Sequence, residues 1–242
     1  MKLRQSIEGF TLIELAIAMA IAAMLITATV QLAIATSSSY RLQQNLGALQ
    51  ENARFALITI QGELEAAGYA PQPWDSTFEG WSIDGQDAIT ANSDRIVIRR
   101  WSDRNCFEND NPDLDESGLP RHYLRETAFF INGSKNLAQT CKYGPDSGLL
   151  TTQANNLGLV EHAEALQFLY AEDSDDDGSA DRWVYARDWS DERRIQGVRV
   201  AILLATPSGT RSTEPLTIQV LDNEISVPAD GRKRMAHETV AH

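Results

Sequence analysis

Residues 9–35 read GFTLIELAIAMAIAAMLITATVQLAIA. The apolar run from Phe10 to Ala35 covers about 26 residues, which as a helix is long enough to cross a hydrocarbon core of about 30 Å. One carboxylate, Glu14, lies just inside this run, where a charged side chain costs about 2.5–3.5 kcal/mol to insert. The stretch therefore predicts a membrane-spanning helix in which Glu14 has a function and needs a cationic partner.

Simpler interpretations of this segment stay open. A secretory signal peptide has a basic start, an apolar core and small residues at its end, and Ala33 and Ala35 could imitate that end. If the segment were only a single-pass membrane anchor, Lys2 and Arg4 would be its cytoplasmic charges, but the presence of Glu14 would have no explanation. A carboxylate near a helix N-terminus could also favour the helix dipole and reach the lipid headgroups.

Gly9 through Glu14, preceded by the basic leader 1–9, resemble the processing site of type IV prepilins and type II secretion pseudopilins. The resemblance implies that prepilin peptidase cuts after Gly9 on the cytoplasmic side and methylates the new N-terminal Phe10. The new ammonium group could pair with the Glu14 carboxylate of a neighbouring subunit, because two charges that are each costly in a low dielectric neutralise one another. Such a pair would favour assembly and fix the axial register.

The apolar pattern continues past the membrane-spanning run with the spacing of one helix face. Its members recur in steps of three or four: Leu42, Leu46, Leu49, Ala53, Ala56, Ile60, Leu64 and Ala67. Gly68 is a plausible end, and the first proline is Pro71. We expect one helix over residues 10–67, with a membrane or filament-core half at 10–35 and an amphipathic half within 36–68.

Residues 69–242 predict a β-rich globular domain, because roughly 170 residues are ample for one core. Asn132–Lys135 has the composition of a hairpin turn. The expected strands are 95–99, 126–131, 136–142, 165–171, 181–186 and 197–205, with weaker candidates at 215–220 and 235–240. Loops are expected at 71–93 and 102–122. The fold class is α+β and pilin-like: a long N-terminal helix packed on an antiparallel sheet.

Further stretches resemble the minor pilin family PilW. They are Gln50–Ala56 followed by Glu65–Tyr69, Leu166–Tyr170 running into an Asp-rich loop, and the ending that contains Arg232–Arg234 and Thr239-Val240. The family implies a structural subunit of a tip complex that primes type IV pilus assembly, in support of adhesion, twitching motility or DNA uptake. A J-type minor pseudopilin of a type II secretion system and a tip-displayed calcium-dependent adhesin stay open as alternatives.

The resemblance also implies where the chain lies and what it meets. It would be single-pass in the inner membrane with residues 69–242 in the periplasm, and at the extracellular pilus tip after assembly. Its partners would be prepilin peptidase, other minor pilins, the major pilin and a tip adhesin. The formal net charge of −13 argues against direct binding of nucleic acid, which needs clustered Lys and Arg. The cluster Arg232–Arg234 is expected to be solvated.

Two cysteines, Cys106 and Cys141, lie in the part expected outside the cytoplasm, where disulfides persist. With two cysteines the pairing is unambiguous if it forms, and it would contribute up to about 4 kcal/mol in the chain-entropy model. Two buried free thiols are the alternative.

Residues 173–181 read DSDDDGSAD, with oxygen donors at alternate positions: Asp173, Asp175, Asp177, Ser179 and Asp181. Gly178 stands where an EF-hand-like calcium loop needs its sharp turn. Position twelve, which should be a bidentate carboxylate, is Val184, so another ligand would have to come from Glu172, Asp188 or the acids of 110–116. The alternative is a solvated acidic turn without metal.

Enzymatic activity has little support in the sequence. The four histidines are scattered, at His122, His162, His237 and His242. Their surroundings show no Ser/His/Asp spacing, phosphate loop or zinc pattern. The prediction is a protein that is not an enzyme, and apart from calcium no cofactor is expected.

Overall fold

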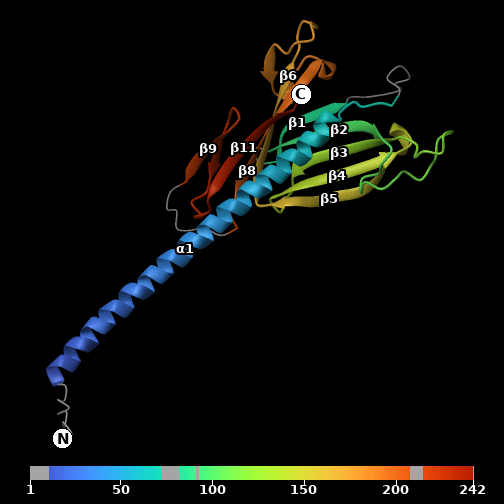
Figure 1. Cartoon of the computed structure of the whole chain (residues 1–242). Coiled ribbons are helices and arrows are strands. Elements are labelled where there is room, and N and C mark those ends of the chain that lie inside the picture. The colour runs from blue at the N-terminus through green and yellow to red at the C-terminus, as the bar shows by residue number, and fades with distance from the viewer. Residues whose placement is uncertain (1–10, 72–81, 91–92, 208–214, 242) are drawn as a thin grey trace. The chain divides into compact units, whose positions relative to one another are not determined.

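Helix α1 (Leu12–Glu65) is continuous (Figure 1). The computed structural model describes residues 11–71, 82–90, 93–207 and 215–241. Two compact units divide the chain, Met1–Gly47 and Ala48–His242, and α1 contributes to both. The expected helix is confirmed to within two residues at its end, where Gly68 adopts a φ of 72°, a left-handed conformation that glycine favours.

The part of α1 that belongs to the second unit buries one face. Its buried residues are spaced by one, three or four positions and comprise Leu49, Ala53, Ala56, Leu57, Ile60 and Leu64. The apolar period therefore predicted the packed face of the amphipathic half correctly.

The second unit contains a five-stranded antiparallel sheet in the order β1-β2-β3-β4-β5. Its strands are β1 (Ile83–Thr90), β2 (Ser93–Ser102), β3 (Tyr123–Ile131), β4 (Asn136–Gly144) and β5 (Thr151–Glu161). β3 and β4 form the expected hairpin, since Lys135 N–H donates to the Asn132 carbonyl at 2.9 Å.

A four-stranded antiparallel sheet has the order β11-β8-β6-β7, and a separate hairpin joins β9 to β10. These strands are β6 (Ala163–Glu172), β7 (Arg182–Val184), β8 (Ile195–Ala205), β9 (Leu216–Val220), β10 (Asn223–Val227) and β11 (Arg234–Ala241). Three short 3-10 turns lie between strands: η2 (Ser147–Leu149), η3 (Ala186–Asp188) and η4 (Glu192–Arg194). A long helix packed on antiparallel sheets confirms the α+β class.

The larger core cluster combines the buried face of α1 with residues of both sheets, among them Phe129 of β3 and Phe168 of β6. A smaller cluster covers the opposite face of β6 and β8 with the β9–β10 hairpin, through Val220, Ile225 and Val227. β8 is apolar at successive positions because both of its faces are buried. The two sheets are joined where Leu166 and Phe168 donate their N–H groups to Ser93 Oγ and Asp94 Oδ2, at 3.0 and 2.9 Å.

Three expectations about strands were wrong. β1 lies in the segment 71–93 that was expected to be a loop, because Gly, Gln and Asp dilute its β pattern and pairing with β2 decides its conformation. β5 and β10 were missed; β5 is a polar edge strand whose pairing with β4 shifts register three times. The strand expected at 181–186 stops at Val184, where the chain turns into η3.

Candidate functional site

A reciprocal set of hydrogen bonds between Thr11 and Glu14 closes the start of α1. Glu14 Oε2 accepts from the backbone N–H and from the Oγ1–H of Thr11, each at 2.9 Å, and Glu14 N–H donates to Thr11 Oγ1 at 3.3 Å. This arrangement is a capping box, and it gives the carboxylate polar partners within its own helix. Gly9 and Phe10, the expected cleavage and methylation positions, lie outside the described residues.

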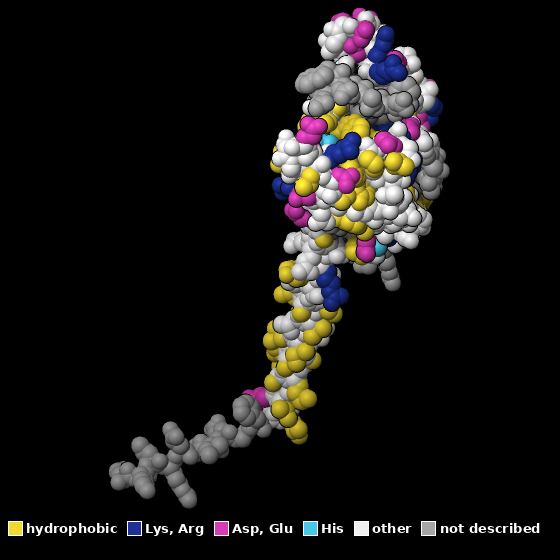
Figure 2. Space-filling view, turned by 90° about the vertical axis from the view of Figure 1, so that its right-hand side faces the viewer, with side chains coloured by type: hydrophobic (Ala, Val, Ile, Leu, Met, Phe, Trp, Pro, Cys, Tyr) yellow, Lys and Arg dark blue, Asp and Glu magenta, His cyan; other side chains and the backbone are white. Residues whose placement is uncertain are grey.

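Residues 12–36 of α1 are exposed and mostly apolar (Figure 2), and α1 is long and apolar enough to cross a membrane. Its hydroxyl groups donate to carbonyls one turn back, each at 2.8 Å: Thr27 to Ala23, Thr29 to Ile26, Thr36 to Leu32 and Ser38 to Ala35. These polar side chains are thus satisfied inside the helix, as an apolar surrounding requires. The helix fits a membrane-anchored chain.

The expected disulfide is present between Cys106 and Cys141, with a Cα–Cα distance of 5.9 Å. It fastens the loop after β2 to β4, and Cys106 N–H also donates to Gln153 Oε1 at 2.9 Å. Asn111 closes the loop from inside, because its Nδ2 donates to the carbonyls of Ser102 and Arg121 at 2.7 and 2.9 Å. Residues 102–122, which were expected to be a loop, are therefore a loop that internal hydrogen bonds and the disulfide to β4 hold in place.

A buried ionic cluster joins this loop to α1. Arg125 of β3, whose side chain is 4% exposed, contacts Glu63 at 2.7 Å and Glu108 at 2.5 Å. Arg100 of β2 contacts the second oxygen of Glu63 at 3.2 Å. The sequence analysis missed this cluster because Glu63 and Arg125 are 62 residues apart, and no local spacing reveals such a pair.

The cluster Arg232–Arg234 is not simply solvated, contrary to expectation. The Arg234 side chain is 3% exposed and contacts Glu164 at 2.6 Å and Asp230 at 2.7 Å. Hydrogen bonds from Arg234 and from the Arg232 backbone hold the pKa of Asp230 well below its usual range. These residues fasten β11 to the start of β6 and form a structural cluster.

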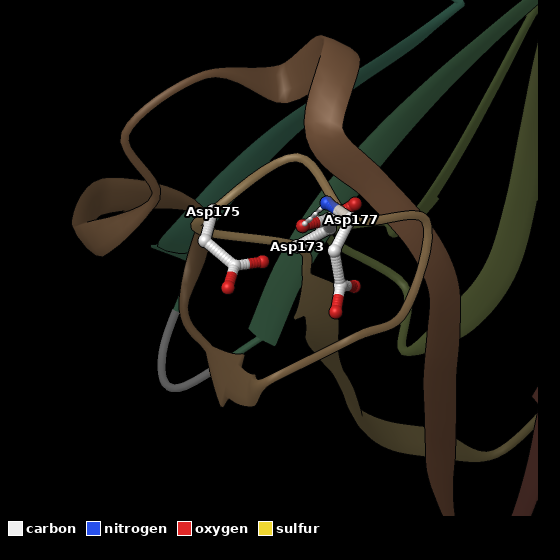
Figure 3. A group of neighbouring side chains, drawn as sticks. All are labelled: Asp173, Asp175 and Asp177. Atoms are coloured by element: carbon white, nitrogen blue, oxygen red, sulfur yellow. Dashed lines mark hydrogen bonds between the residues drawn. The ribbon is translucent and has the colours of Figure 1, made fainter.

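The Asp-rich loop after β6 brings three carboxylates together, those of Asp173, Asp175 and Asp177 (Figure 3). One oxygen of each lies within 4.8 Å of the others, with Asp173 buried and the other two exposed. Asp173 Oδ2 accepts from Gly178 N–H at 2.7 Å, and its Oδ1 accepts from Asp176 N–H at 2.7 Å. Repulsion from Asp177 raises the pKa of Asp175. The loop thus collects like charges around a preformed turn.

The remaining expected ligands are placed differently. Asp181 is outside the group of three, and its Oδ2 accepts from the backbone and the hydroxyl of Ser174 at 2.7 and 2.6 Å. Ser179 is exposed and donates its N–H to Asp177 Oδ1 at 2.8 Å. Val184, at position twelve, is buried in the core.

Glu172 is committed to other partners and does not fill the missing position. Its Oε1 accepts from Ser190 N–H at 2.6 Å, and its Oε2 accepts from Arg182 Nη2 at 2.8 Å. Burial alone would raise the pKa of Glu172, but these hydrogen bonds outweigh it and lower the pKa to about 2. Asp188 contacts Arg187 at 3.5 Å. A cation bound here would therefore have an incomplete set of protein ligands, and water would have to complete its coordination.

Two family models match the chain. The model of the type IV pilus-assembly protein W, PilW, matches residues 129–242, and that of the prokaryotic N-terminal methylation motif matches residues 4–30. No curated protein and no solved structure matches the chain. The second match includes Gly9, Phe10 and the capping box, and the first runs from β3 to the end of the chain. Together with the apolar helix and the antiparallel sheets, these matches support a PilW-like, type IV pilus-related pilin.

Proposed function

We propose that this chain is a minor pilin that is cut between Gly9 and Phe10, joins a complex at the tip of a type IV pilus and primes its assembly. The methylation-motif match over residues 4–30 carries the proposal, because the processing chemistry needs Gly9, Phe10 and Glu14 in this order at the start of an apolar helix. The PilW match favours a pilus over a secretion system. Adhesion, motility or DNA uptake would then depend on this chain through the pilus.

The geometry at the start of α1 suggests how cleavage promotes assembly. Before cleavage the Phe10 nitrogen is an amide, and Glu14 has its hydrogen bonds from Thr11. Hydrolysis of the Gly9–Phe10 bond leaves a carboxylate on Gly9 and an ammonium group on Phe10. In a helix bundle that ammonium group can neutralise the Glu14 carboxylate of a neighbouring subunit, which favours the assembled state over the free one.

Two observations support the proposed location. Lys2 and Arg4 precede the apolar helix, and positive charges of this kind favour the cytoplasmic side, as expected if the second unit lies outside the cytoplasm. The Cys106–Cys141 disulfide fits an oxidising compartment such as the periplasm. Prepilin peptidase, other pilins and a tip adhesin are the proposed partners.

A Glu14→Gln variant of the full-length chain, expressed in cells that lack the wild-type copy, tests the proposal. We expect mass spectrometry to show normal cleavage and methylation of Phe10. The number of surface pili should fall at least about tenfold, since losing a desolvated charge pair costs more than about 1.4 kcal/mol. Glu51→Gln, an exposed position on the same helix, is the matched control and should leave pili unchanged. Wild-type pilus numbers with Glu14→Gln, or an uncut chain in wild-type cells, would contradict the proposal.

We also propose that residues 173–181 hold calcium through Asp173, Asp175 and Asp177, with the Ser179 carbonyl and a water on Asp181. The supporting observation is the bond from Gly178 N–H to Asp173 Oδ2, which holds the turn with three carboxylates close together and without neutralising them. Calcium at ten times its Kd would stabilise the fold by about 1.4 kcal/mol and raise the Tm by about 3–5 °C. Thermal unfolding in calcium, in magnesium and in chelator measures this, and an equal Tm in all three would contradict calcium binding.

A further inference from the structure

The loop between β2 and β3 ends in a turn with two exposed leucines. Leu114 and Leu119 are 64% and 62% exposed. Leu114 forms an antiparallel bridge with Pro120, and Asp115 N–H donates to the Leu119 carbonyl at 2.8 Å, so the two leucines flank a single turn. We name residues 113–121 the leucine turn. Two large apolar side chains are thus held out in solvent on an ordered loop, where they are available for contact with a partner.

The leucine turn is held rigid by its own side chains. Asp115 Oδ1 accepts from Ser117 N–H at 2.8 Å and from Leu119 N–H at 2.9 Å. Asp113 Oδ2 accepts from the Tyr123 hydroxyl at 2.5 Å, which ties the turn to β3. Because these bonds already order the turn, a partner would not have to meet the entropic cost of ordering it.

The surroundings of the leucines are acidic. Residues 103–121 contain six carboxylates and two arginines: Asp103, Glu108, Asp110, Asp113, Asp115 and Glu116 against Arg104 and Arg121. This loop is at the right-hand edge of Figure 1 and faces the viewer in Figure 2, which shows apolar side chains flanked by acidic and basic ones. A complementary partner would offer an apolar recess with Lys and Arg at its rim.

The small size of the leucine turn limits the class of partner further. Two leucines and their neighbours bury far less than the roughly 1,200 Å² of a stable complex between free proteins. Such a contact becomes effective when both chains are already held together, because tethering replaces the free concentration by a much higher local one. The membrane-anchoring helix of this chain provides that condition toward other anchored chains.

We propose that the leucine turn docks into an apolar, basic-rimmed recess on the globular domain of a different pilin subunit in the same assembly. This inference rests on the proposed function, since it requires a neighbour anchored by an equivalent helix. Leu114 and Leu119 supply the buried apolar contact, and Glu116 supplies charge complementarity at the edge.

Site-specific photo-crosslinking tests the proposal in cells that make the full-length chain. A p-benzoylphenylalanine residue replaces Leu119 or, as matched control, Leu149 in η2, which is 60% exposed. We expect the probe at position 119, but not at 149, to join a different subunit whose sequence carries an N-terminal methylation motif. Adding Leu114→Ser should lower the yield about tenfold, and adding Glu116→Lys about fivefold. Leu149→Ser should leave the yield unchanged.

Several outcomes would overturn the inference. They are crosslinks from position 119 to a second copy of this chain or to lipid, no crosslink there, and equal yields from positions 119 and 149. Processing at Phe10 and pilus number are measured in the same cells. Normal processing and a pilus that depends on this chain, without the crosslink, would overturn the inference alone. A chain whose deletion leaves pili unchanged would overturn the proposed function.

Discussion

Loops 103–122 and 173–181 are both acidic, yet their carboxylates are arranged in opposite ways. In loop 103–122 several acids have separate partners, for example Glu108 with Arg125 and Asp115 with the backbone of its own turn. In loop 173–181 three carboxylates converge within 4.8 Å. The same composition can therefore build a rigid turn in which acids have separate hydrogen-bond or ion-pair partners, or collect acids whose repulsion a cation would relieve.

The two loops also differ in the kind of bond that holds them. A covalent bond, Cys106–Cys141, fastens the first to β4. An ion pair closes the second, where Glu172 of β6 faces Arg182 of β7 at 2.8 Å. The disulfide responds to reductant and the ion pair responds to acid, so the two bonds can be broken one at a time.

Removing the disulfide should have the largest effect. Cys106→Ala with Cys141→Ala removes a link between residues 35 apart, and the unfolding free energy should fall by about 4 kcal/mol. Chemical denaturation measures the loss, and limited proteolysis should show new cuts within 103–122. Wild-type protein in reductant is the control and should lose the same amount. A loss below about 1 kcal/mol would mean that Arg125 and Asn111 hold the loop without the disulfide.

Breaking the Glu172–Arg182 ion pair with acid should have the next largest effect. Because the pKa of Glu172 is lowered to about 2 from 4.5, its contribution is complete above pH 4.5 and is lost as the pH falls toward 2. At neutral pH it amounts to about 3 kcal/mol. Glu172→Gln should therefore destabilise strongly at pH 7 in urea denaturation and hardly at all near pH 2. Glu161→Gln, at an exposed position, should have no effect at either pH, and a pH-independent loss for Glu172→Gln would contradict the pKa shift.

The sequence predicted those features of both loops that depend on neighbouring residues. The position of the Asp-rich turn and the helix that precedes the β domain follow from local composition and period, and the disulfide follows from the presence of two cysteines. The ion pairs do not: Glu164 and Arg234 are 70 residues apart, and only the packing of β6 against β8 and β11 brings them together. Likewise, loop 103–122 looked irregular because its order comes from side chain to backbone bonds that follow no period.

A matched pair of glycine substitutions compares the two turns directly. Gly118 and Gly178 have φ values of 79° and 88° and open space where a Cβ would lie, so alanine costs only backbone strain, about 1 kcal/mol at each. Gly133→Ala, at a position with open space and no positive φ, is the control. Both variants should lower the Tm equally. Gly118→Ala should reduce crosslinking from position 119, and Gly178→Ala should reduce the calcium-dependent rise in Tm. An effect of Gly118→Ala on the calcium response would remove the distinction between the loops.

The smallest effect should come from removing one charge from each loop. Repulsion from Asp177 and Asp181 raises the pKa of Asp175, so the folded state is favoured when Asp175 is protonated and loses that advantage as the pH rises. Asp175→Asn should therefore raise the Tm slightly in chelator at neutral pH and abolish the rise produced by calcium. Asp115→Asn keeps an oxygen that can accept from Ser117 and Leu119, so it should change neither quantity. If Asp175→Asn lowers the Tm in chelator, the three carboxylates do not repel one another, and the reason to expect a cation between them disappears.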